Sequence, residues 1–304
     1  MSLLLENITK VYGEQKALNN VSFSAKKGEI IALLGPNGAG KSTSMKILSC
    51  FLQSDEGTAM VCGYDVKKNP QEVKNRLGYL PENNPLYFDM YIKEYLQFVS
   101  EIHKIRDKKN RVEEVIDLVG LEQEQSKKIG QLSKGYKQRV GIAQAIIHDP
   151  EVLILDEPTS GLDPNQLAEV RNLIQKLGAE KTVILSTHIM QEVEAICDRV
   201  VVINKGEIVA DKATTAFVSA PSDQAIVTIE LLQGLDVVHF EKIKGVQDIK
   251  KIGNKKIKIY SNKDLDIRPQ IFDMVVQYGD KLLSMQQEEQ GIEDVFKKLT
   301  NTKN

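Results

Sequence analysis

A glycine-rich segment near the N-terminus, Gly35–Thr43, constrains the fold of this chain more than any other stretch. It directly follows an apolar run, Gly28–Leu34, and its spacing matches the phosphate-binding pattern GxxxxGKS/T. In this pattern the glycines let backbone N–H groups converge on a phosphate, and the following helix contributes the positive end of its dipole. The segment therefore predicts a buried strand, a phosphate-binding loop (P-loop) and a helix, in that order.

The side chains of the P-loop have separate expected roles. The Lys41 ammonium supplies a point charge to the β- and γ-phosphates of a nucleoside triphosphate, and the Ser42 hydroxyl is placed to ligate Mg²⁺. A nucleoside triphosphate and Mg²⁺ are therefore the expected ligands of this segment. The P-loop residues expected to bind the nucleotide are Gly35, Pro36, Asn37, Gly38, Ala39, Gly40, Lys41, Ser42 and Thr43.

Two consecutive acids end a second apolar run. Val152–Asp156 is typical of a strand buried on both faces, so Asp156 is expected at the same sheet edge as the P-loop, where it can hold Mg²⁺ through water. Glu157 follows directly and is expected to point to the opposite side, where it can act as general base on the attacking water. Two acids after a strand are usually a solvated turn, but their pairing with a P-loop favours a catalytic site.

Further apolar runs predict an α/β architecture for the first part of the chain. Residues 182–187 are expected to form a strand, and residues 198–210 a hairpin around Lys205 and Gly206. Residues 67–148 have helical spacing of apolar side chains and read as a helical subdomain inserted into the sheet domain. The predicted fold is a P-loop nucleotide-binding domain over residues 1–215.

Residues 216–304 are expected to form a small accessory or regulatory domain. The polar stretch 211–223 is a predicted linker. The order strand, helix, strand, strand, helix, strand is then typical of a ferredoxin-like α+β module. The expected elements are residues 225–231, 237–244, 246–252, 255–261, 267–278 and 281–287, followed by a last helix, 292–299.

Composition restricts the compartment and the partners. The formal net charge of -2 provides no basic field for nucleic acid, so no nucleic-acid partner is expected. Three scattered cysteines indicate reduced thiols rather than a disulfide framework. No apolar run reaches the roughly 18 residues that a membrane span needs, and the N-terminal residues lack a secretory pattern. A cytoplasmic protein is expected, and any path across a membrane has to come from another chain.

Three more motifs follow in a fixed order. They are Leu132–Val140 (LSKGYKQRV), Ser160–Asp163 (SGLD) and Ser186–His188 (STH). With the P-loop and the two acids, they resemble the signature sequence, the D-loop and the switch-histidine segment of the ATP-binding subunits of ATP-binding-cassette (ABC) transporters. The resemblance covers about residues 2–210 and rests on several independent motifs that occur in the family's order.

This resemblance implies a head-to-tail dimer in which two copies of the chain sandwich two ATP molecules. Ser133 and Gly135 would then contact the γ-phosphate of ATP held by the other copy, and Asp163 of the D-loop belongs with the nucleotide-binding residues. His188 would contact the γ-phosphate and fix the attacking water and Glu157. Tyr12 matches the aromatic residue that stacks on adenine in this family; packing within a sheet is its alternative reading.

Two positions depart from the commonest family pattern. Glu82 stands where a glutamine usually contacts Mg²⁺ and the attacking water, and it remains able to ligate the metal. Lys134 replaces a glycine within the signature sequence, whereas Ser133 and Gly135 are retained. Both departures are similar to those of multidrug and ABC-2-type export ATPases, and within that branch the motifs resemble ATP-binding subunits associated with bacterial gliding motility.

The resemblance also implies polytopic membrane permease subunits as partners, with this chain peripheral on the cytoplasmic face of the inner membrane. A loop after Glu82 carries clustered apolar residues that suit either buried helix packing or a groove for a cytoplasmic helix of the permease. These residues are Leu86, Tyr87, Phe88, Met90 and Tyr91.

Two other classes of protein are weighed against an ABC transporter ATPase. A soluble ABC mechanoenzyme that acts on a non-membrane partner would need a long coiled-coil insertion, a basic tract or tandem cassettes, and none is visible. A non-enzymatic nucleotide-gated regulator would be favoured by loss of Glu157 or His188, and both are present. The cargo is open, because the resemblance places its contacts in the membrane subunits.

Overall fold

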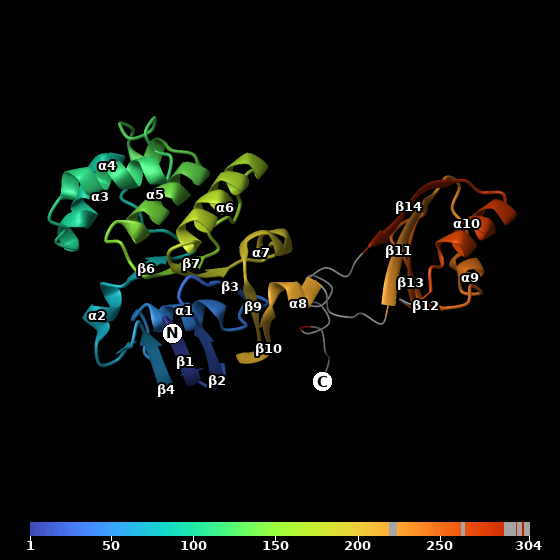
Figure 1. Ribbon diagram of the computed structural model, residues 1–304, viewed down its shortest axis with the longest axis horizontal. Coiled ribbons are helices and arrows are strands. Elements are labelled where there is room, and N and C mark those ends of the chain that lie inside the picture. The colour runs from blue at the N-terminus through green and yellow to red at the C-terminus, as the bar shows by residue number, and fades with distance from the viewer. Residues whose placement is uncertain (219–223, 263–264, 289–295, 297–299, 301–304) are drawn as a thin grey trace. The chain divides into compact units, whose positions relative to one another are not determined.

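The computed structural model describes residues 1–218, 224–262, 265–288, 296 and 300 (Figure 1). The chain divides into two compact units, the first formed by Met1–Thr214 and the second within residues 215–298.

A six-stranded sheet with the order β10-β9-β3-β8-β7-β6 forms the centre of the first unit. Its strands are β3 (Ile30–Leu34), β6 (Leu77–Leu80), β7 (Val152–Asp156), β8 (Thr182–Ser186), β9 (Arg199–Asn204) and β10 (Glu207–Ala213). All neighbours are parallel except β9 and β10, which form the predicted hairpin. Every residue of β3, β7 and β8 is buried, as their continuous aliphatic runs predict.

A second, antiparallel sheet has the order β2-β1-β4-β5. Its strands are β1 (Leu3–Tyr12), β2 (Gln15–Ala25), β4 (Glu56–Val61) and β5 (Tyr64–Asp65). Helix α1 (Lys41–Leu48) contacts β2 and β4 of this sheet and β7 of the other, and one hydrophobic core includes residues of both sheets and of α1. The helix that starts in the P-loop is therefore clamped between the two sheets.

Helices α3 (Ile92–Ile102), α4 (Lys108–Leu118), α5 (Lys134–Ile146) and α6 (Pro164–Gly178) lie on the other side of the six-stranded sheet (Figure 1). The short elements of the first unit are α2 (Pro70–Lys74), which contacts β5 and β6, η1 (Ile129–Gln131) and α7 (Met190–Ile196). The range 67–148, predicted to be a helical insertion, also contains strand β6, which extends the parallel sheet. Its four residues are too few for a clear strand pattern.

The predicted linker, residues 211–223, is wrong for its first part. Strand β10 continues to Ala213 and helix α8 covers Thr214–Val218. Thr214 is buried, and its hydroxyl donates a 2.6 Å hydrogen bond to the carbonyl oxygen of Cys197. The polar composition of this stretch reflects an exposed edge strand, because most β10 side chains face solvent.

The second unit has the predicted order of elements. It consists of β11 (Gln224–Leu231), α9 (Val237–Phe240), β12 (Val246–Lys251), β13 (Lys256–Asn262), α10 (Arg268–Gln277) and β14 (Leu282–Glu288). The sheet is antiparallel with the order β12-β13-β11-β14, which is the ferredoxin-like arrangement, and α9 and α10 share one hydrophobic core with it. The predicted helix 292–299 falls almost entirely outside the described residues.

The end of β10 gives a test of where the first unit stops. We expect a fragment of residues 1–214 to be about 2–4 kcal/mol more stable to unfolding than residues 1–210. The shorter fragment loses the pairing of residues 211–213 with Val201, Val200 and Arg199, and both hydrogen bonds of Thr214. Urea unfolding followed by circular dichroism measures the difference, and equal stabilities would contradict it.

Candidate functional site

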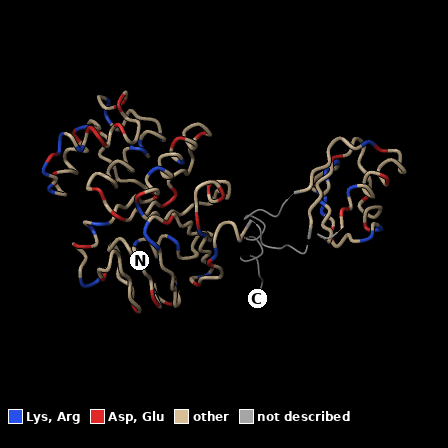
Figure 2. The backbone as a smooth tube through the Cα atoms, viewed as in Figure 1, with Lys and Arg blue, Asp and Glu red and all other residues tan. Residues whose placement is uncertain are grey.

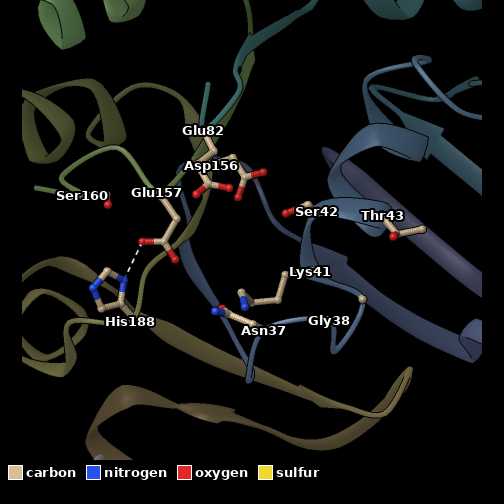
Figure 3. A pocket seen from close by; sticks show the side chains of 11 residues that line it. Asn37, Gly38, Lys41, Ser42, Thr43, Glu82, Asp156, Glu157, Ser160 and His188 are labelled. Carbon is tan, nitrogen blue, oxygen red and sulfur yellow. Dashed lines mark hydrogen bonds and ion pairs between the residues drawn. The ribbon is translucent and has the colours of Figure 1, made fainter. Parts of the chain in front are cut away.

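A cavity of about 570 Å³ opens beside the P-loop and is lined by both predicted catalytic residues, Glu157 and His188 (Figure 3). Its lining comes from the P-loop between β3 and α1 and from the segments that follow β6, β7 and β8. Because these strands are neighbours in a parallel sheet, their C-terminal ends meet at one edge. The lining residues are Asn37, Gly38, Gly40, Lys41, Ser42, Thr43, Glu82, Asp156, Glu157, Ser160 and His188.

The P-loop wraps around the ammonium group of Lys41. Its Nζ donates hydrogen bonds to the carbonyl oxygens of Gly35, at 2.7 Å, and Pro36, at 3.2 Å. Gly40 precedes α1 with a φ of 114°, and a Cβ there would lie 2.6 Å from Leu18 Cδ2. Only glycine therefore allows the loop to enter the helix at this point.

Charge around Lys41 is unevenly distributed. Burial lowers the pKa of Lys41, and three carboxylates nearby oppose this shift. They belong to Glu157, Asp156 and Glu82. Elsewhere in the first unit, acidic and basic residues are interspersed along the backbone (Figure 2), so these few groups set the local field.

Asp156 is fixed by its neighbour in the sheet. Its side chain is 3% exposed and accepts a 2.6 Å hydrogen bond from the Ser186 hydroxyl, whose oxygen accepts a 2.9 Å bond from the backbone N–H of Glu157. In Figure 3 the carboxylates of Asp156 and Glu82 and the Ser42 hydroxyl face one part of the cavity. Two carboxylates and a hydroxyl are a donor set that fits Mg²⁺, which completes its shell with water and phosphate oxygens.

Glu157 has a strained backbone and a partner for its carboxylate. Its φ of 51° lies in the left-handed region, which costs a non-glycine residue about 1–3 kcal/mol. The side chains of Glu157 and Asp156 diverge (Figure 3), although both residues line the same cavity. Glu157 Oε2 and His188 Nδ1 are 2.8 Å apart and form a hydrogen bond. This contact is of the kind by which a histidine could orient a glutamate that acts as a general base.

Other predicted residues lie outside the lining of this cavity. Ser133 is the N-cap of α5 and its hydroxyl accepts from the N–H of Tyr136, so Gly135 lies in the first turn of that helix. Asp163 caps α6 and accepts two backbone hydrogen bonds at 3.0 Å. Within one chain, the signature residues are therefore not combined with the P-loop.

A smaller cavity of about 310 Å³ adjoins the other side of the P-loop. Pro36, Asn37, Gly38 and Ala39 line it together with residues that include Gln15. Gln15 is the strand partner of Tyr12, whose ring is half exposed at the end of β1. An exposed ring does not support the alternative that Tyr12 is simply packed within the sheet.

Two site residues, Ser160 and Ser186, were not assigned a role from the sequence. Ser160 lines the cavity, and Ser186 links Asp156 to the backbone of Glu157. For Ser186 a signal exists, because a hydroxyl residue ends the buried strand beside the one that ends in Asp156.

No helix within the described ranges is both long and apolar enough to cross a bilayer.

Comparisons with known proteins agree with this geometry. The family model described as ABC transporter matches residues 18–160. The chain is 33% identical to the bacitracin transport ATP-binding protein BcrA of Bacillus licheniformis, over 96% of this chain and 95% of that protein. It is also 33% identical to the linearmycin resistance ATP-binding protein LnrL of Bacillus subtilis (strain 168), over 98% of each.

Solved structures give the same result. The ATP-binding subunit of an ABC transporter matches with a TM-score of 0.66 at 29% identity, over 71% of this chain and 92% of that one. A dimeric ATP-binding cassette in a post-hydrolysis state, bound to ADP and Pi, matches with a TM-score of 0.64 at 28% identity, over 69% and 98%. The chain therefore belongs to the ABC transporter family, as an ATP-binding and ATP-hydrolysing subunit that energises transport.

Proposed function

We propose that this chain hydrolyses MgATP as a head-to-tail dimer, using Glu157 as general base and His188 to orient it. The 2.8 Å contact between these side chains, facing the P-loop across one cavity, carries the proposal. Lys41 binds the β- and γ-phosphates, and Ser42, Asp156 and Glu82 hold Mg²⁺, which neutralises phosphate charge when bound. Tyr12 stacks on adenine beside the smaller cavity.

The second copy of the chain supplies what one copy lacks. Ser133 and Gly135 lie at a helix start, where free N–H groups suit a phosphate, but they do not line the P-loop cavity of their own chain. Asp163 is at the start of α6 next to them. A related cassette is described as dimeric with ADP and Pi. Each ATP site is thus proposed to be complete only between two copies.

We further propose that polytopic permease subunits of the inner membrane are the partners and that the direction is export. A groove of about 450 Å³ shares Ser42, Glu82 and Asp156 with the P-loop cavity. Phe51 lines this groove and is 77% exposed. Tyr87, Phe88 and Tyr91, which follow Glu82 within nine residues in the sequence, are each about half exposed. Of the predicted apolar cluster, Leu86 alone is fully buried, so most of it favours a docking surface.

The names of relatives support export without fixing the cargo. Two relatives that match nearly the whole chain are named for bacitracin transport and linearmycin resistance. The loop 78–87 and the signature sequence also resemble those of gliding-motility ATP-binding subunits, which makes a motility component the alternative partner. In either case the chain would sit on the cytoplasmic face of the membrane, held by its partners.

Glu157→Gln tests the general base. We expect this variant to bind ATP but to turn it over about 10²–10⁴-fold more slowly, because the amide cannot accept the proton of the attacking water. Phosphate release and ATP affinity are measured side by side. Glu151→Gln is the control: Glu151 directly precedes β7, whereas Glu157 directly follows it. This variant removes the same charge and should keep wild-type turnover. Wild-type turnover in Glu157→Gln would refute the assignment.

Lys41→Ala tests the P-loop. Loss of this charge should weaken ATP binding on the order of 10- to 100-fold. Hydrogen bonds that involve a charged group contribute more binding free energy than hydrogen bonds between neutral groups. Equilibrium binding of a fluorescent ATP analogue measures the change. Lys74→Ala removes an exposed lysine of α2 and serves as the matched control. Unchanged affinity in Lys41→Ala would contradict the predicted phosphate contact.

Capture from membranes tests the partner. Tagged Glu157→Gln protein, incubated with ATP and detergent-solubilised native membranes, should retain a polytopic membrane protein identified by mass spectrometry. Phe51→Ser in the same background should reduce that capture, whereas Phe272→Ser, an exposed aromatic of the second unit, should not. Recovery of soluble proteins or nucleic acid alone would contradict the proposal of a permease partner and would favour a soluble ABC mechanoenzyme.

A further inference from the structure

Three carboxylic acids are buried in the described part of the chain, namely Asp156, Glu192 and Asp280. Asp156 belongs to the ATP site, and Asp280 accepts hydrogen bonds from three backbone N–H groups of its own unit. Glu192, on helix α7, is 2% exposed and does not line the P-loop cavity. Its burial therefore needs a different explanation, because a buried carboxylate is costly without specific partners.

The partners of Glu192 are two threonine hydroxyls from separate segments. Its Oε2 accepts 2.8 Å hydrogen bonds from Thr159 Oγ1 and from Thr187 Oγ1, and both threonines are 2% exposed. Thr187 Oγ1 in turn accepts a 3.1 Å bond from the N–H of Ile189. The other oxygen, Oε1, is buried with no hydrogen-bond partner among the described residues. The carboxylate of Glu192 thus connects these two threonines by hydrogen bonds.

Each of these threonines is next to a proposed catalytic group. Thr159 follows Glu157 by two residues, and Thr187 directly precedes His188. The Glu157–His188 hydrogen bond and the two bonds of Glu192 therefore connect the same two segments at different points. Glu157 also has a left-handed backbone, which persists only where its surroundings hold it.

We propose that Glu192 is a positioning residue of the ATPase, which holds the segments of Glu157 and His188 at the spacing that their hydrogen bond requires. This inference rests on the proposed roles of Glu157 and His188. The negative charge matters, because a carboxylate binds hydroxyl donors more strongly than an amide of the same shape does. A packing role alone would need only the volume of the side chain.

The test compares ATP turnover by the full-length chain in four variants. Glu192→Gln keeps the shape and loses the charge; Thr159→Val and Thr187→Val each remove one donor; the fourth combines Glu192→Gln with Thr159→Val. We expect kcat to fall about tenfold in Glu192→Gln and about fivefold in each threonine variant. The reason is that the rate of the chemical step falls steeply when catalytic groups are displaced. KM for ATP should stay within about twofold, because the P-loop contacts are intact.

The double variant and a control separate positioning from general destabilisation. If Glu192 acts through Thr159, the double variant should be about as slow as Glu192→Gln alone, since one contact cannot be lost twice. Glu194→Gln removes the same charge from an exposed position of α7 and should keep wild-type kcat. Melting temperatures and ATP affinity confirm that the variants fold, and if Glu192→Gln does not fold, the threonine variants carry the test.

Two outcomes would overturn the proposal. Wild-type kcat in Glu192→Gln or in both threonine variants would show that the catalytic pair does not depend on these bonds. Independent, multiplicative losses in the double variant would show that Glu192 acts through other contacts. A failure of the underlying roles looks different, because Glu157→Gln would then hydrolyse ATP at the wild-type rate whatever Glu192 does.

Discussion

The site depends above all on the parallel pairing of β3, β8, β7 and β6, because this pairing brings four chain segments to one edge of the sheet. Register decides the details. Asp156 is paired with Ser186, which explains why the serine hydroxyl reaches both the Asp156 carboxylate and the next backbone N–H. A slip of one residue would turn these side chains to the opposite face of the sheet and dismantle the proposed metal-binding side of the cavity.

Electrostatics then restrict what can bind. Lys41 faces three carboxylates across the P-loop cavity, so a triphosphate entering it meets negative charge on one side and a single ammonium on the other. Coulomb repulsion between carboxylates and phosphate is strong where water is excluded. In the proposed function, a divalent cation held by Ser42, Asp156 and Glu82 would offset that repulsion, so nucleotide and metal would bind together. The carboxylate of Glu82 would increase this dependence on the cation, because it adds one more negative charge than a glutamine would.

What the sequence predicts well here is local. The P-loop, the buried strands, the β9–β10 hairpin and the order of elements in the second unit follow from short patterns and are confirmed. The antiparallel sheet was not predicted, because β1 pairs with the distant strand β4 and its ladder with β2 has three register shifts. Glu192 was not predicted either: its spacing on α7 resembles an ordinary polar helix position, and only the fold brings Thr159 and Thr187 to it.

The hydrogen bonds around Glu192 also bear on how two copies would communicate. Thr159 begins the segment that ends at Asp163, and Asp163 accepts from the N–H of Gln166, whose side chain donates a 3.3 Å bond to Ser133. The segment that Glu192 connects to Thr187, the residue before His188, is therefore linked to Ser133 through Gln166. In the proposed dimer, Ser133 contacts the phosphate held by the other copy, so closure at that surface would act on the same backbone that positions Glu157. Binding by one copy and hydrolysis in the other would then share a single short segment.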